Sequence, residues 1–185
     1  MQADDIKRCL AVLGVLLGVV VVGLGADWPQ WRGLNRDGHS PETGLLKTWG
    51  EDGPRRLWVA DGLGDGYSSV TVVNGRIYAM GMPRGSKEGF ISVFGLDGNL
   101  QQRIAYGEEW SKSYAGGRYA PTVDGDRLYL MTGFGRLVCV DHRRGAVLWA
   151  EDVAGKFGGP SPVHGFAEAP LIGRASCRER VFRVV

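Results

Sequence analysis

Short apolar runs separated by glycine-containing turns fill the middle of the chain, and their pattern repeats. Apolar runs flank Asn74-Gly75 and Asp124-Gly125, two dipeptides that tolerate the positive φ angles of a tight hairpin turn. Two further apolar runs follow each hairpin, so each unit predicts four short strands. The expected strands are 69–73, 76–80, 90–96 and 100–106 in the first unit, and 120–123, 127–132, 136–141 and 147–152 in the second.

The two units recur at a period of about 45 to 50 residues, and a third unit begins near residue 170. Leu57-Trp58 and Leu148-Trp149 lie roughly two periods apart, with Arg103-Ile104 midway between them. Four antiparallel strands at this period are typical of a propeller blade, whereas a parallel β-helix repeats faster and a helical repeat has a period of about 3.6 residues. The sequence therefore predicts an all-β fold, a β-propeller of four-stranded antiparallel blades, with about two complete blades present.

Two segments carry a family resemblance. The stretch 140–149, Val-Asp-His-Arg-Arg-Gly-Ala-Val-Leu-Trp, resembles the strand, aspartate, turn-glycine and Leu-Trp signature of the pyrroloquinoline-quinone-like repeat. The stretch 27–33, Asp-Trp-Pro-Gln-Trp-Arg-Gly, resembles the mature N-terminus of exported bacterial quinoprotein-like propellers. The resemblance spans residues 27–171 and implies an exported propeller of about eight blades, of which this chain is a fragment, in a family with many members that bind no quinone. The first unit departs from the signature, because Gly98-Asn99-Leu100 replaces its end and no docking tryptophan follows.

The N-terminus predicts export. Lys7 and Arg8 precede an uncharged apolar stretch, 9–26, that ends in small residues. This pattern is typical of a cleaved secretory signal, and an uncleaved membrane anchor is the alternative. We interpret residues 1–26 as a signal peptide, 27–56 as a segment leading into the propeller and 57–171 as blades. The protein is then expected in the periplasm or cell envelope, without a membrane span after cleavage.

The last residues differ in character from the repeats. Residues 172–181 read as the translation of a common short-read sequencing adapter, so we interpret 172–185 as a non-native tail; a genuine basic tail is the alternative. The whole chain has a formal charge of +2, but this tail contributes +3 and residues 1–26 are neutral, which leaves about −1 for the remainder. A remainder without a basic excess argues against a nucleic-acid partner.

Motifs that carry chemistry are scarce. The glycine-rich stretch 62–66 is not followed by a helix pattern and predicts a turn between blades rather than a nucleotide-binding loop. Asp124-Gly125-Asp126 lacks the further ligands of a calcium loop and predicts a hairpin. The histidines His39, His142 and His164 are too far apart in sequence for a metal-ligand pair, and Cys139, in an alternating strand pattern, is expected to pack in the core rather than react. No catalytic residue, metal ligand or cofactor is therefore predicted.

Aromatic faces stack on sugars and cofactors, so the tryptophans of this chain are candidates for a binding platform. Trp58 and Trp149, however, occupy the same repeat position, which predicts rings packed between adjacent blades. Trp110 has no repeat counterpart and leaves both interpretations open.

Three connections between blades, 64–68, 116–119 and 164–168, occupy equivalent repeat positions. Such connections gather around the central channel on one face of a propeller, where ligands usually bind. We therefore expect a protein or small-molecule ligand there, and plain turns are the alternative. The candidate contacts are Asp65, Tyr67, Ser68, Arg118, Tyr119, His164 and Glu168.

Two functions follow from this sequence. The first is a non-catalytic exported propeller that serves as a binding or scaffolding module. The second, implied by the resemblance, is an alcohol or sugar dehydrogenase that uses pyrroloquinoline quinone beside a calcium ion, with an active site largely in the blades that this fragment lacks. Those enzymes carry an adjacent Cys-Cys pair and Asn, Glu and Asp ligands, none of which is recognisable in this sequence, so the first function is preferred.

Overall fold

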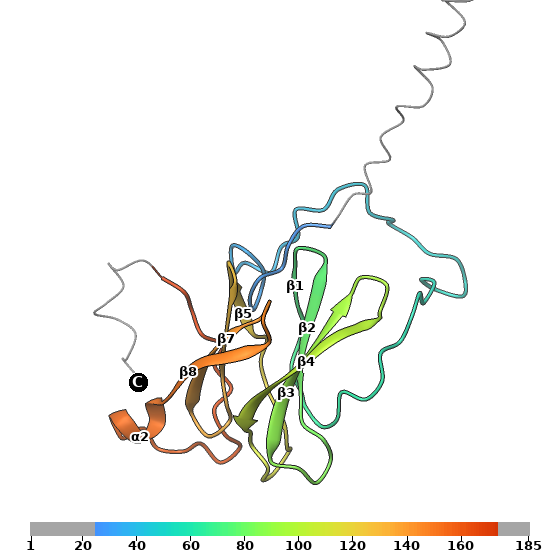
Figure 1. The fold of residues 1–185 in the computed structure, drawn as a ribbon. Helices are drawn as coiled ribbons and strands as arrows, with labels where there is room; N and C mark the ends of the chain where they lie inside the picture. The colour runs from blue at the N-terminus through green and yellow to red at the C-terminus, as the bar shows by residue number, and fades with distance from the viewer. Residues whose placement is uncertain (1–24, 174–185) are drawn as a thin grey trace, which may run out of the picture.

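Two four-stranded antiparallel sheets form the main regular structure of the described residues. The computed structural model describes residues 25–173, and the two sheets lie side by side in it (Figure 1). The first sheet has the order β1 (Thr71–Val73), β2 (Arg76–Gly81), β3 (Glu88–Gly95) and β4 (Leu100–Glu108). The second has the order β5 (Thr122–Asp124), β6 (Arg127–Met131), β7 (Arg136–Asp141) and β8 (Ala146–Asp152), and a short helix, α2 (Val153–Phe157), follows it. The expected four-stranded blades are confirmed, with strand ends that differ from the prediction by no more than two residues.

The register within each sheet explains why the blades repeat. Asn74 and Gly75 both have positive φ angles, as the predicted hairpin turn requires. A bulge between Val93 and Phe94 of β3 recurs between Cys139 and Val140 of β7, at the same position of the repeat. Such a bulge leaves two residues of one strand opposite one of its partner and bends the sheet locally. The repetition shows that the two sheets share this irregularity as well as their strand order.

This register corrects one expected alignment. Trp149 pairs with Cys139, and the residue that pairs at the equivalent position of the first sheet, opposite Val93, is Gln102. The counterpart of Leu148-Trp149 in the first blade is therefore Gln101-Gln102, and not Arg103-Ile104. The midpoint of the sequence period was misleading because the connections between strands differ in length between the two units: residues 82–87 join β2 to β3, whereas 132–135 join β6 to β7. The absence of a docking tryptophan in the first unit is confirmed, since glutamine takes its place.

The core lies between the two sheets. It combines residues of the first sheet such as Tyr78, Ile91 and Ile104 with Leu128 and Val138 of the second, all of which are at most 2% exposed. Apolar side chains that alternate along each strand produce this buried face. The face of the second sheet that points away from this core is more open, and Trp149 is 44% exposed there. Cys139, which pairs with Trp149, is fully buried, as expected.

A histidine joins the two sheets inside this core. The hydroxyl of Tyr78 lies 2.9 Å from Nδ1 of His142, and Nε2 of His142 lies 3.1 Å from the carbonyl oxygen of Gly125. Because that carbonyl can only accept, we assign the proton to Nε2, so that Nδ1 accepts the hydroxyl proton of Tyr78. The role of His142 in this arrangement is to pair buried polar groups across the blade interface.

Contacts near the inner strands also recur. The hydroxyl of Thr71 donates to the carbonyl oxygen of Pro121 at 2.5 Å, and that of Thr122 donates to Pro170 at 2.7 Å. Pro170 therefore occupies the same position relative to the second blade that Pro121 occupies relative to the first. This agrees with the start of a third unit near Pro170. The N-terminal segment crosses both sheets, because Trp28 bridges to Val72 and the Pro29 carbonyl accepts from Val123.

The shared tryptophan position packs one blade against the turn of the next. The indole of Trp58 lies against Gly98 in the β3–β4 turn, where an added Cβ would be 2.6 Å from the ring, and its Nε1 donates to the carbonyl of Leu96 at 2.9 Å. Gln102 lies in the same way against Gly145 of the β7–β8 turn. Packing of Trp58 and Trp149 between complete adjacent blades stays a prediction.

The same comparison makes Gln102→Trp a stabilising substitution. A tryptophan at this position should lie on Gly145 as Trp58 lies on Gly98, and the added apolar burial should raise the free energy of unfolding by about 1 kcal/mol. Urea denaturation followed by circular dichroism measures the change. Gln101→Trp is the matched control, because Gln101 is an exposed neighbour in the same strand. Equal effects of the two variants would contradict the equivalence of Gln102 and Trp58.

The expected signal peptide and tail fall almost wholly outside the described residues. Within 25–173, no helix has the length and apolar character that crossing a membrane requires.

Candidate ligand-binding site

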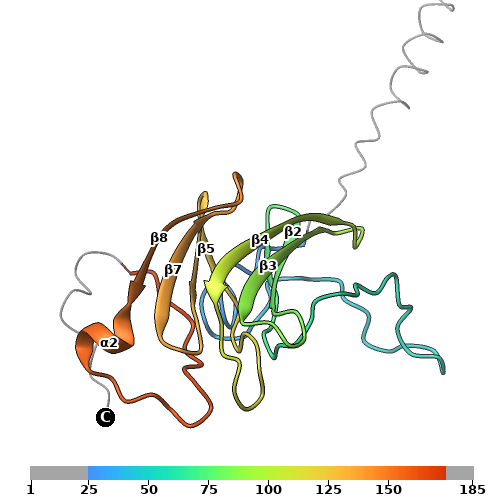
Figure 2. The same ribbon diagram turned by 60° about the horizontal axis from the view of Figure 1, so that its bottom comes forward.

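The three predicted connections come together at one end of the sheets, the lower end in Figure 2. Asp65 exchanges backbone hydrogen bonds with Met82 just after β2, and Gly66 forms a parallel bridge with Gly117. The third connection reaches the same end through Phe166, whose N–H donates to the carbonyl of Gly133 at 2.9 Å. We call the segments 64–68, 109–119 and 162–168 the loop end.

An exposed row of three aromatic rings crosses the loop end. Tyr67 and Tyr114 meet edge to face with centroids 6.0 Å apart, and Tyr114 and His164 do the same at 5.5 Å. Both tyrosines are more than 60% exposed. Each ring comes from a different segment, so the row, defined as Tyr67, Tyr114 and His164, exists only when all three segments are in place.

Tyr114 adopts a backbone conformation that tyrosine rarely takes. Its φ is +53°, in the left-handed region that strains a residue with a bulky side chain. The guanidinium of Arg118 donates from Nη2 to the carbonyl oxygens of Tyr114 at 2.6 Å and Ser113 at 2.8 Å. Trp110 Nε1 donates to the same Ser113 oxygen at 2.8 Å. These bonds hold an exposed ring in a strained position, a combination found at functional sites.

A buried carboxylate supports the loop end from below. Glu109 is fully buried and accepts hydrogen bonds from the Tyr106 hydroxyl at 2.8 Å and from the backbone N–H groups of Trp110 and Gly133, both at 2.7 Å. Burial, and then the nearby Glu109, raise the pKa of Tyr106, so its hydroxyl stays protonated and donates. Glu109 thereby ties β4 to the turn between β6 and β7. The sequence offers no signal for this role, because the adjacent pair Glu108-Glu109 is typical of a solvated loop.

The structure places the seven candidate contacts in different environments. Tyr67 and His164 lie in the aromatic row, and Asp65 lies beside it. Ser68 is partly buried and its hydroxyl donates to the carbonyl of Ser69, while the carboxylate of the exposed Glu168 accepts from the N–H of Ala167. Both groups therefore have local partners. Tyr114, which the sequence analysis did not select, completes the row.

Two of the expected exposed tips are corrected. Tyr119 is only 3% exposed, because the chain enters β5 there and the ring joins the core between the sheets. Its hydroxyl has no hydrogen-bond partner, and burial, followed by the charges of Glu109 and Glu168, raises its pKa. Arg118 is half-buried, and its guanidinium donates hydrogen bonds to backbone carbonyl oxygens. Arg118 therefore holds the backbone beneath the row, Tyr119 belongs to the core, and neither side chain projects as an exposed tip.

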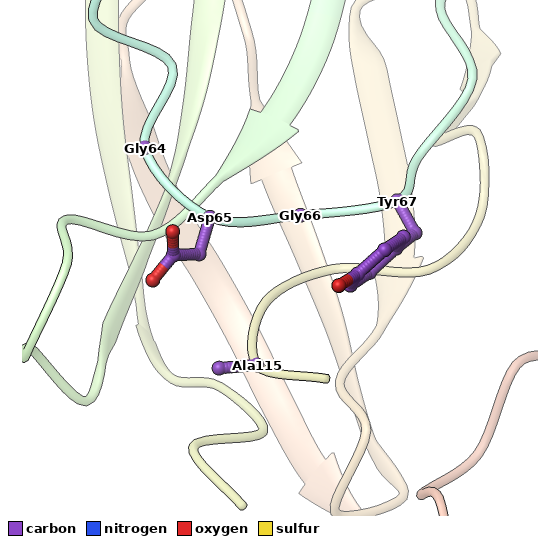
Figure 3. Close-up of a pocket in the computed structure, with 5 residues that line it drawn as sticks. All are labelled: Gly64, Asp65, Gly66, Tyr67 and Ala115. Carbon is purple, nitrogen blue, oxygen red and sulfur yellow. The ribbon is translucent and has the colours of Figure 1, made fainter. Parts of the chain in front are cut away.

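A pocket of about 350 Å³ opens beside the row. It is lined by Gly64, Asp65, Gly66, Tyr67 and Ala115, with the side chains of Asp65 and Tyr67 on the same side of the chain (Figure 3). The Asp65 carboxylate lies 3.4 Å from Nε of Arg84, whose side chain is 91% exposed. The pocket thus combines one carboxylate, one aromatic ring and otherwise glycine and alanine.

Residues of the types that ligate metals are scattered over the part of the chain that the structure describes. No three His, Cys, Asp or Glu residues among 25–173 come together as metal ligands. Cys139 is the single cysteine in that range and lies buried in β7, so an adjacent cysteine pair is not available there.

The two repeated four-stranded sheets, with their loop-end site, define a blade module of the β-propeller class. Residues 87–174 match a family model described as "Outer membrane protein assembly factor BamB", which covers the end of the first blade and all of the second. Over this part of the chain, the match confirms the resemblance to the pyrroloquinoline-quinone-like repeat family. No curated protein matches the chain.

Proposed function

We propose that the chain is a non-catalytic, exported β-propeller module that binds a protein partner at the loop end. The observation that carries the proposal is the braced aromatic row. Folding holds Tyr114 in a strained conformation with three side-chain hydrogen bonds to the backbone of its loop, and yet its ring is left in solvent. Exposed tyrosines on a fixed backbone provide large contact area at low entropic cost, which suits recognition of another protein.

The family match also supports a role in binding other proteins. The matching model is described as an outer membrane protein assembly factor, a name that implies contact with other proteins. The predicted signal peptide would take this chain to the periplasm or cell envelope. A scaffold of this kind needs shape and loop tips but no catalytic group, which agrees with the scarcity of chemical motifs in the sequence.

Site-specific photocrosslinking in the producing cell tests the proposal. A photoreactive phenylalanine analogue at position 114 should crosslink a partner protein, and His164→Ala should reduce that product several-fold by removing one ring of the row. The same analogue at Leu45, which is equally exposed but distant in the N-terminal segment, is the control. No product at position 114, or an equal product at both positions, would contradict binding at the loop end.

The dehydrogenase alternative has a direct test of its own. The purified full-length protein mixed with calcium and pyrroloquinoline quinone should not reduce a redox dye when ethanol or glucose is added. Dye reduction that depends on both the quinone and the alcohol would replace the proposed module with an enzyme.

A further inference from the structure

The pocket beside the aromatic row has a geometry that its sequence explains. Gly66 bridges Gly117, so the segment 65–67 is extended and its alternate residues, Asp65 and Tyr67, project to the same side (Figure 3). Gly66 lies between them without a side chain, and Ala115 faces them with a single methyl group. The space between the carboxylate and the ring therefore stays open.

The chemistry of this space is that of a cation site. A carboxylate attracts a positive charge directly, and the face of a tyrosine ring attracts it through the ring quadrupole. Residues two apart on an extended chain are about 6 to 7 Å apart, so one cationic group fits between the two side chains. No basic side chain lines the pocket to oppose a cation.

An intramolecular guanidinium already approaches the carboxylate, but loosely. Nε and Nη2 of Arg84 lie 3.4 and 3.5 Å from the same oxygen of Asp65, and the Arg84 side chain is almost fully exposed. An ion pair with this exposure contributes little to stability. A guanidinium that enters the pocket and also contacts the Tyr67 ring binds Asp65 more favourably than the exposed Arg84 does, and it can displace Arg84.

We propose that the pocket receives a basic side chain, arginine above all, from an extended segment of the partner protein. This inference rests on the proposed function and specifies what the loop end recognises. The Asp65 carboxylate supplies the charge complement, and the Tyr67 ring covers the guanidinium plane. Neighbouring residues of the partner segment then lie along Tyr114 and His164.

Peptide titration of the purified chain, followed by backbone amide chemical shifts of Gly64, Gly66 and Ala115, tests this inference. The probe is acetyl-Gly-Arg-Gly-amide, and its control is the citrulline peptide, which has nearly the same shape without the charge. The arginine peptide should bind at least about fivefold more tightly than the citrulline peptide, as expected for a cation between a carboxylate and an aromatic face.

Two substitutions with opposite effects make the test specific. Asp65→Asn should remove the preference for arginine over citrulline. Arg84→Ala should tighten binding of the arginine peptide about two- to threefold, because the competing guanidinium is gone. A merely structural role of Asp65 predicts no gain from Arg84→Ala. Asp52→Asn removes an exposed charge elsewhere and should leave both titrations unchanged.

The outcomes separate this inference from the proposed function. Equal binding of the two peptides, or the absence of shifts with either, would overturn the cation pocket. Crosslinking at position 114 can succeed in each of those cases, so binding at the loop end would stand. Loss of crosslinking together with a charge-dependent peptide titration would instead leave a cation pocket without the proposed partner.

Discussion

Glu109→Ala should lower the free energy of unfolding by about 3 to 5 kcal/mol, because it leaves buried hydrogen-bond donors without an acceptor. The carboxylate is fully buried and accepts from the Tyr106 hydroxyl and from two backbone N–H groups, those of Trp110 and Gly133. Alanine removes the acceptor and opens a cavity that these donors line. Urea denaturation, followed by far-ultraviolet circular dichroism, measures the loss.

Glu109→Gln separates the hydrogen bonds from the charge. Its amide oxygen can still accept from both backbone N–H groups, and the Tyr106 hydroxyl can rotate to accept from the amide nitrogen. We therefore expect a loss of only about 1 kcal/mol, well below that of alanine. If alanine and glutamine destabilise equally, or if alanine changes stability by less than about 1 kcal/mol, Glu109 does not brace the two blades as described.

The parts of the fold that were predictable from the sequence depend on neighbouring residues. Asn74-Gly75 determines the first hairpin through local backbone preferences. The second hairpin turns at Gly125-Asp126, one residue later than the predicted Asp124-Gly125, because Asp124 still pairs with Arg127. Alternating apolar residues identify the strand faces. Repetition then predicts the blades, and the equivalence of Trp58 and Trp149 predicts packing between them. The error at Arg103-Ile104 arose because the connections between strands differ in length between the two units, so that the midpoint in sequence is not the equivalent position in the sheet.

The parts of the candidate site that were not predictable depend on contacts between distant segments. The repeat placed Tyr67 and His164 at equivalent connections, and the structure brings both into one row with Tyr114. Tyr114 itself lies in a loop without a repeat counterpart, and its positive φ depends on Arg118. The burial of Tyr119 depends on which way the chain turns into β5. A sequence period identifies which connections meet, but not which of their side chains face solvent.

Gly116→Ala should disrupt the loop end itself. Gly116 has a φ of +101°, and a Cβ added there would lie well inside contact distance of the Asp65 carbonyl oxygen. Strain at this φ and a clash with backbone, which cannot rotate away, should together cost about 3 kcal/mol of the free energy of unfolding. The segments 64–68 and 109–119 would be forced apart, and the aromatic row would be lost with them.

Gly125→Ala is the matched control for this substitution, because Gly125 also has a positive φ, +57°, but no atom lies within 4 Å of an added Cβ. It should cost only about 1 kcal/mol, the penalty for the backbone conformation alone. Crosslinking at position 114 should therefore fall in Gly116→Ala and persist in Gly125→Ala, measured at a temperature where both variants are folded. A Gly116→Ala variant that keeps its stability and its crosslink would show that the row does not depend on the close approach of the two segments, and that a single loop presents Tyr114.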